Sequence, residues 1–171
     1  TSKVEVKPLQ EGNEAPVSVY ENARRIIAIG ASTGGTVAIS KVLEKLPSST
    51  VAIVIAQHIP QAFSASFSDR LNKTCSITVE EAKDGQMIRN GHVYIAPGGY
   101  HLTVKKNGPY YVCGLDDSPL VNKHRPSVDV LFKSVASSVG RNAFGIILTG
   151  MGRDGAEGLL EMKQAGACTL A

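Results

Sequence analysis

The chain has 171 residues, of which 43% are hydrophobic and 19% charged, and its formal net charge is +3; these values are typical of one globular domain with a core of its own. The basic residues are too few and too rarely interleaved with aromatic residues to indicate nucleic-acid binding. No apolar stretch approaches the ~20 residues of a membrane span, and the first residues lack the order of a signal peptide, so we expect a cytoplasmic protein without membrane insertion.

Strand and helix patterns alternate along most of the chain. Residues 1–23 hold prolines and scattered charges without an apolar period, which predicts a linker. Further along, strands are predicted at 25–30, 51–56 and 144–148, helices at about 39–46, 63–71, 128–139 and 156–162, and a last apolar stretch at 168–170. Short β segments between residues 77 and 112 predict an antiparallel excursion. The order predicts an α/β fold: a doubly wound, mostly parallel sheet with helices on both faces and a small antiparallel excursion.

A serine stands directly after the first predicted strand, in the turn Gly30-Ala31-Ser32-Thr33-Gly34. This Gly-x-Ser-x-Gly pattern between a strand and a helix is the sequence form of a nucleophile elbow. The glycines at 30 and 34 are expected to leave room around the hydroxyl, while the free N–H groups of the following helix face a developing oxyanion. A glycine-rich turn before a helix also binds phosphate in nucleotide-binding proteins. Ser32 alone therefore leaves both functions open.

Polar side chains follow two further predicted strands. His58 comes after the second strand, and Asp154 follows the strand predicted at 144–148. Because the carboxyl ends of parallel strands meet at one edge of a sheet, we expect Ser32, His58 and Asp154 to lie close together. A hydroxyl to attack, an imidazole to carry the proton and a carboxylate to orient the imidazole are the parts of a serine hydrolase.

The alternatives are weaker. A dinucleotide site would place an acidic residue where Gln57 and His58 stand, and the Gly-Lys-Ser/Thr of a phosphate-binding loop is missing. The four histidines lack ligand spacing, so no metal and no cofactor is expected. The three cysteines are odd in number and without CxxC spacing, and we expect them to be reduced and buried.

Each proposed triad residue also has a purely structural explanation. Ser32 is a suitable cap for the helix that follows it, His58 is compatible with a loop histidine, and Asp154 is compatible with a cap for the helix after Gly155. Asp129 and the pair at 116–117 compete for the third position of the triad. None of these competing acids directly follows a predicted parallel strand.

Residues 26–171 resemble the catalytic domain of the chemotaxis protein-glutamate methylesterases, which demethylate bacterial chemoreceptors. The resemblance lies in five blocks in the same order, at residues 29–35, 57–60, 94–98, 124–129 and 147–155. It implies that Ser32 is the nucleophile, His58 the base and Asp154 the orienting acid. It further implies that the backbone N–H of Met151 donates to the oxyanion, and it places Thr33 and Gly152 at the same part of the site.

The resemblance also implies the substrates and partners. These are γ-glutamyl methyl esters, and certain glutamines, on the signalling helices of methyl-accepting chemotaxis receptors. Relatives usually carry an amino-terminal receiver domain, so we expect residues 1–23 to be the remnant of a linker and residues 24–171 to be a catalytic domain that continues in the family beyond residue 171. A signalling module that binds receptor helices through the same cleft without catalysis is the alternative function.

Overall fold

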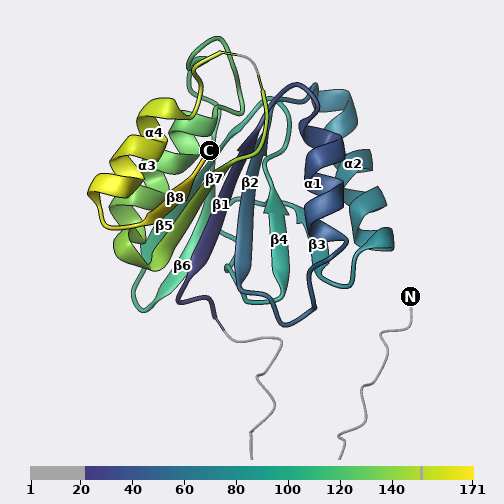
Figure 1. Cartoon of the computed structure of the whole chain (residues 1–171), viewed down its shortest axis with the longest axis horizontal. Helices are drawn as coiled ribbons and strands as arrows, with labels where there is room; N and C mark the ends of the chain where they lie inside the picture. The colour runs from purple at the N-terminus through teal and green to yellow at the C-terminus, as the bar shows by residue number, and fades with distance from the viewer. Residues whose placement is uncertain (1–21, 151) are drawn as a thin grey trace, which may run out of the picture.

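The computed structural model describes residues 22–150 and 152–171. Six strands form a parallel sheet in the order β3-β4-β2-β1-β7-β8, and two more form an antiparallel pair, β5-β6 (Figure 1). The strands are β1 (Ile26–Ala31), β2 (Ala52–Gln57), β3 (Thr78–Glu81), β4 (His92–Ile95), β5 (His101–Asn107), β6 (Tyr110–Asp116), β7 (Ala143–Ile147) and β8 (Cys168–Leu170). The helices are α1 (Gly35–Leu43), α2 (Gln61–Thr74), α3 (Val128–Ser138) and α4 (Ala156–Gln164).

Helices cover both faces of the parallel sheet, with α1 and α2 on one side and α3 and α4 on the other (Figure 1). Successive residues of a strand point to opposite faces, so Ile29 packs with α1 and α2, whereas its neighbour Ala28 packs with α3. All six residues of β2 are buried, as expected for a central strand covered twice. The predicted fold class is confirmed.

The antiparallel part is smaller than the sequence predicted. The segment near residues 93–96 belongs to β4, which pairs in parallel with β2 and with β3, so the antiparallel excursion among the described strands consists of β5 and β6. The sequence pattern failed here because a short apolar strand looks the same in a parallel and an antiparallel pair, and β3 carries a single buried side chain, Val79.

The prediction that the three cysteines are buried was wrong for two of them. Cys113 is buried, whereas Cys75 is only partly buried and Cys168 is exposed; all three are free thiols. Cys168 begins β8, an edge strand that pairs with β7 on one side and with no other strand of the described residues. None of the described helices is long and apolar enough to cross a membrane.

The chain order reverses at β1. The chain runs from β1 to β2 on one side, and β7 later joins β1 on the other side. In open α/β sheets, ligands bind beyond the carboxyl ends of the strands at such a point. The loops that follow β1, β2 and β7 meet beyond the carboxyl ends of these strands and hold Ser32, His58 and Asp154.

Candidate functional site

Ser32 lies in a tight turn between β1 and α1 that is fixed on both sides. Its backbone N–H donates to Thr149 O at 2.8 Å, and its own carbonyl accepts from Gly35 N at 2.8 Å. Gly34 caps α1 in the left-handed conformation, with φ 75°, which glycine adopts without strain. These bonds hold the serine between the β1 and β7 loops.

Gly30 differs from the sequence expectation, in which it leaves room around the Ser32 hydroxyl. A Cβ at Gly30 would collide with the side chain of Val128, so Gly30 allows α3 to approach β1 rather than clearing space for the hydroxyl. The glycine that approaches the nucleophile is Gly150, where a Cβ would lie 2.6 Å from Ser32 Cβ. The close approach of the β7 loop thus restricts the position of Ser32.

His58 joins the other two predicted residues through both of its ring nitrogens. Its Nδ1 lies 2.8 Å from Ser32 Oγ, and its Nε2 lies 2.6 Å from Asp154 Oδ2. The backbone N–H of His58 donates to Ala31 O at 3.1 Å, which carries the pairing of β1 and β2 one residue past their ends. The side chains of His58 and Asp154 are only 10% and 3% exposed. The three residues predicted from the strand ends therefore lie together as a hydrogen-bonded chain.

Asp154 does not cap the helix that follows it; it caps α3 instead. Its carboxylate accepts from the backbone N–H groups of Val128 at 2.7 Å and Asp129 at 3.1 Å. The first N–H groups of a helix have no partner within the helix, and the amino end favours negative charge. Helix α3 thus stabilises the ionised form of the triad acid.

Two side chains that the sequence analysis did not single out complete the surroundings of Asp154. Ser127 donates its hydroxyl to Asp154 Oδ1 at 2.7 Å, and Asn122 donates its Nδ2 to the same oxygen at 2.9 Å. Burial alone would raise the pKa of Asp154. Hydrogen bonds from His58, Asn122, Ser127 and the Val128 N–H outweigh burial and leave the pKa well below its usual range.

Asp129, the main competitor for the third position, has another partner set. It is buried and accepts from Asn122 Nδ2 at 2.7 Å and from the Gly158 N–H at 2.7 Å. It therefore ties α3 to α4 and orients Asn122, whereas the acid bonded to His58 is Asp154. Asp116 bonds to Ser118 and stays outside this network.

The side chain of Gln57 holds the turn of Ser32 in place by hydrogen bonds. This buried side chain donates its Nε2 to Ser32 O at 2.9 Å and to His58 O at 3.1 Å, which links the loops after β1 and β2. A Cβ at Gly35 would collide with the Gln57 amide oxygen, so glycine at this position leaves room for the Gln57 side chain. The sequence did contain a signal for Gln57, since this residue begins one of the five blocks that resemble the family.

The candidate oxyanion residues are only partly described. Met151 lies outside the described residues. Gly152 has φ 92° and lines a small cavity of about 80 Å³ together with Ser32 and His58. Thr33 is exposed beside the nucleophile; its carbonyl accepts from Thr149 Oγ1 at 2.9 Å, and its N–H has no acceptor among the described residues.

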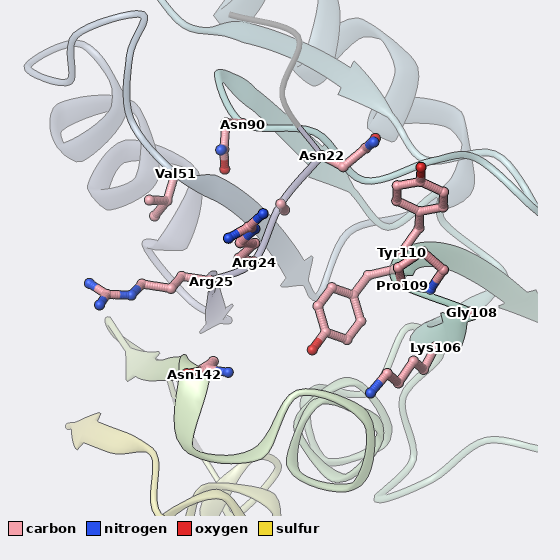
Figure 2. Close-up of a pocket in the computed structure, with 12 residues that line it drawn as sticks. Asn22, Arg24, Arg25, Val51, Asn90, Lys106, Gly108, Pro109, Tyr110 and Asn142 are labelled. Atoms are coloured by element: carbon pink, nitrogen blue, oxygen red, sulfur yellow. The ribbon is translucent and has the colours of Figure 1, made fainter. Parts of the chain in front are cut away.

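A larger cavity, of about 1140 Å³, lies at the other end of the strands, near their amino ends (Figure 2). Its described lining includes Arg24, Arg25 and Lys106 and two tyrosines, but neither serine nor histidine. Its described lining therefore lacks the serine and the histidine of a Ser-His-Asp triad. The small cavity, in contrast, is lined by Ser32, His58 and Asp154.

The comparison with family models matches residues 27–171 to the CheB methylesterase family, which is most of the chain. The chain belongs to the CheB methylesterase family. A structure of the Thermotoga maritima CheB methylesterase catalytic domain superimposes with a TM-score of 0.84 at 38% identity, covering 86% of this chain and 78% of that one.

Curated relatives carry the name protein-glutamate methylesterase/protein-glutamine glutaminase. One from Chromohalobacter salexigens is 59% identical over 150 residues, which cover 88% of this chain and 42% of the relative. One from Escherichia coli (strain K12) is 54% identical over 165 residues, which cover 96% of this chain and 47% of the relative. The chain therefore spans less than half the length of these relatives.

Proposed function

We propose that this chain is a serine esterase that hydrolyses glutamate γ-methyl esters in proteins, with Ser32 as nucleophile, His58 as base and Asp154 as orienting acid. The observation that carries the proposal is the pair of hydrogen bonds on His58, 2.8 Å to Ser32 Oγ and 2.6 Å to Asp154 Oδ2. Membership of the CheB methylesterase family supports the reaction class.

The direction of the proton transfer follows from the charge of Asp154. An ionised carboxylate only accepts hydrogen bonds, so Nε2 of His58 carries the proton and Nδ1 presents its lone pair to the Ser32 hydroxyl. In the well-studied Ser-His-Asp template the two ring nitrogens have the opposite partners, with Nε2 facing the serine. Either nitrogen serves as a base, since only the tautomer changes.

In the first half of the reaction, Ser32 Oγ attacks the ester carbonyl while Nδ1 of His58 takes the hydroxyl proton. The tetrahedral intermediate collapses as the imidazolium returns this proton to the departing methoxy oxygen. Methanol leaves, and the glutamyl group remains bound to Ser32 as an ester.

In the second half, water attacks the acyl group and His58 takes its proton in the same way. Cleavage of the bond to Ser32 Oγ, with return of the proton from His58 to this oxygen, restores the serine hydroxyl, and the glutamate carboxyl group is released and ionises in water. A glutamine side chain follows the same route, with ammonia leaving in place of methanol. The names of the relatives, methylesterase and glutaminase, support both substrates.

The proposed protein substrates are methyl-accepting chemotaxis receptors, and the proposed regulatory partner is a receiver domain in the intact protein. In this proposal residues 24–171 form the catalytic domain and residues 1–23 a linker, with the protein in the cytoplasm and no cofactor required. The backbone N–H groups at Met151, Gly152 and Thr33 are the proposed oxyanion and substrate contacts.

The test is a burst experiment with p-nitrophenyl acetate, followed by mass spectrometry of the quenched protein. We expect a burst of p-nitrophenol and an acetyl group on Ser32, with neither in Ser32→Ala. Release of methanol from methylated receptor fragments then tests the substrate. A wild-type chain that binds these fragments but forms no acyl-enzyme would favour the non-catalytic module instead.

A further inference from the structure

A second imidazole lies flat against the proposed base. The rings of His124 and His58 are stacked, with centroids 3.5 Å apart and planes inclined by 8°. The two edges of the His58 ring are already occupied by Ser32 and Asp154. His124 covers a face of the same ring, so contacts on the edges and on this face restrict its motion.

A tight two-residue turn holds His124 in this place. Val121 and His124 exchange backbone hydrogen bonds, Val121 N to His124 O at 3.0 Å and His124 N to Val121 O at 2.9 Å. The residues between them, Asn122 and Lys123, have φ 52° and 67°. Positive φ at both central positions is the geometry of a type I′ turn, which places the two flanking residues side by side.

The turn is itself attached to the triad. The Asn122 side chain bonds to Asp154 Oδ1 at 2.9 Å and to Asp129 Oδ2 at 2.7 Å. A central residue of the turn thus binds the acid, while the last residue of the turn stacks on the base. A segment that contacts the acid through Asn122 and the base through His124, two positions apart, fixes their relative placement.

We propose that His124 is a positioning residue for catalysis, whose flat ring holds the His58 imidazole in the plane that bonds Ser32 and Asp154 at once. The proposal rests on the function proposed above. Rotation of the His58 ring about its bond to Cβ would break both hydrogen bonds, and a stacked ring opposes this rotation by van der Waals contact.

The nitrogens of His124 are not needed for this role. Neither ring nitrogen bonds to a described residue. Burial lowers the pKa of His124, and the charge of His58 lowers it further, against an opposite effect of Asp154. The neutral form of His124 is therefore favoured beside the imidazolium that forms on His58 during the reaction, and a flat ring without nitrogens is expected to replace it.

The experiment compares His124→Ala, His124→Leu and His124→Phe with p-nitrophenyl acetate. We expect kcat to fall by about 10- to 100-fold in the Ala and Leu variants at unchanged KM, as for a slightly misplaced reacting group. We expect His124→Phe to keep kcat close to that of the wild type, because it restores a flat ring. His92→Ala is the matched control: His92 also stacks on an aromatic ring, Tyr94, but lies at the start of β4, away from the triad.

The outcomes separate the two proposals. Wild-type kcat in folded His124→Ala, or equal rescue by Leu and Phe, would overturn the positioning role, since packing volume alone would then suffice. If His124→Ala does not fold, the Leu and Phe variants decide, because both fill the site. Full activity of Ser32→Ala would instead overturn the proposed function itself.

Discussion

Asn122 Nδ2 donates to Asp154 Oδ1 at 2.9 Å, although the two residues are 32 positions apart in the chain. The same nitrogen donates to Asp129 at 2.7 Å. Asn122 therefore holds two carboxylates at fixed positions, and Asp154 has donors on the side away from His58. The proposed triad is thus part of a wider network at the amino end of α3.

The first prediction concerns this amide. In Asn122→Ala, Asp154 loses a donor and is less firmly oriented, so we expect kcat to fall about tenfold, which corresponds to about 1.4 kcal/mol of transition-state stabilisation. Steady-state hydrolysis of p-nitrophenyl acetate measures the change. Asn142→Ala is the control: this asparagine is exposed and lies near the amino ends of the strands, so its loss should leave kcat unchanged.

The second prediction concerns the triad itself. Ser32→Ala, His58→Gln and Asp154→Asn should each reduce ester hydrolysis by about 10³-fold or more, and the double variant Ser32→Ala/His58→Gln should be no worse than the poorer single variant. Such non-additivity arises because each change disables the same proton transfer. A double variant far below both single variants would show that the two residues act independently.

The third prediction concerns the tautomer of His58. With Nε2–H donated to Asp154 and Nδ1 accepting from Ser32, ¹⁵N NMR of labelled histidine at neutral pH should show a protonated Nε2 and an unprotonated Nδ1 for this residue. Spectra of His58→Gln identify the signals. The opposite tautomer at His58 would contradict the proposed direction of proton transfer.

The fourth prediction concerns the turn after β7. Gly152 has φ 92°, and a Cβ there would meet no other atom within 4 Å, so any cost of substitution comes from the backbone conformation. Valine strongly resists this conformation and would reshape the turn, so Gly152→Val should lose activity by about 10²-fold, the scale of one oxyanion donor. Gly152→Asn is the control, because asparagine tolerates positive φ. Turnover and thermal unfolding of both variants separate a local defect from a global one.

The fifth prediction concerns acid stability. The pKa of Asp154 is lower in the folded chain than in the unfolded chain, so ionised Asp154 favours the folded state. This contribution is complete above the unfolded value of about 3.9 and disappears as the pH falls below it towards the folded value. Thermal unfolding from pH 7 to pH 2.5 should therefore show a wild-type advantage over Asp154→Asn that shrinks below about pH 4. A difference that is constant over this range would contradict the proposed ionisation.

Much of this site was predictable because strands of a parallel sheet bring their carboxyl ends together. Ser32, His58 and Asp154 each follow a strand with a clear apolar pattern, so topology alone placed them at one edge. Asn122, Ser127 and His124 were not found by this argument. They come from the irregular segment between β6 and α3, where no periodicity indicates which side chains point inward.

Some errors arose from what a strand pattern leaves open. The pairing direction of β4 depends on its neighbours in space, and its four residues look the same in either direction. The role of Gly30 depended on Val128, almost a hundred residues away in the chain. Only the packed structure shows that Gly30 makes room for α3 and not for a substrate.

The tight turn that ends at His124 belongs to neither a helix nor a strand of the sheet, yet it contacts both the acid and the base. Segments of this kind open at a lower free energy than the core of a domain. The proposed activity therefore depends on a local equilibrium that is distinct from global unfolding. Amide hydrogen exchange between residues 117 and 127 would measure the free energy of opening of this segment. Low concentrations of urea should abolish hydrolysis while the circular dichroism of the sheet and helices is unchanged.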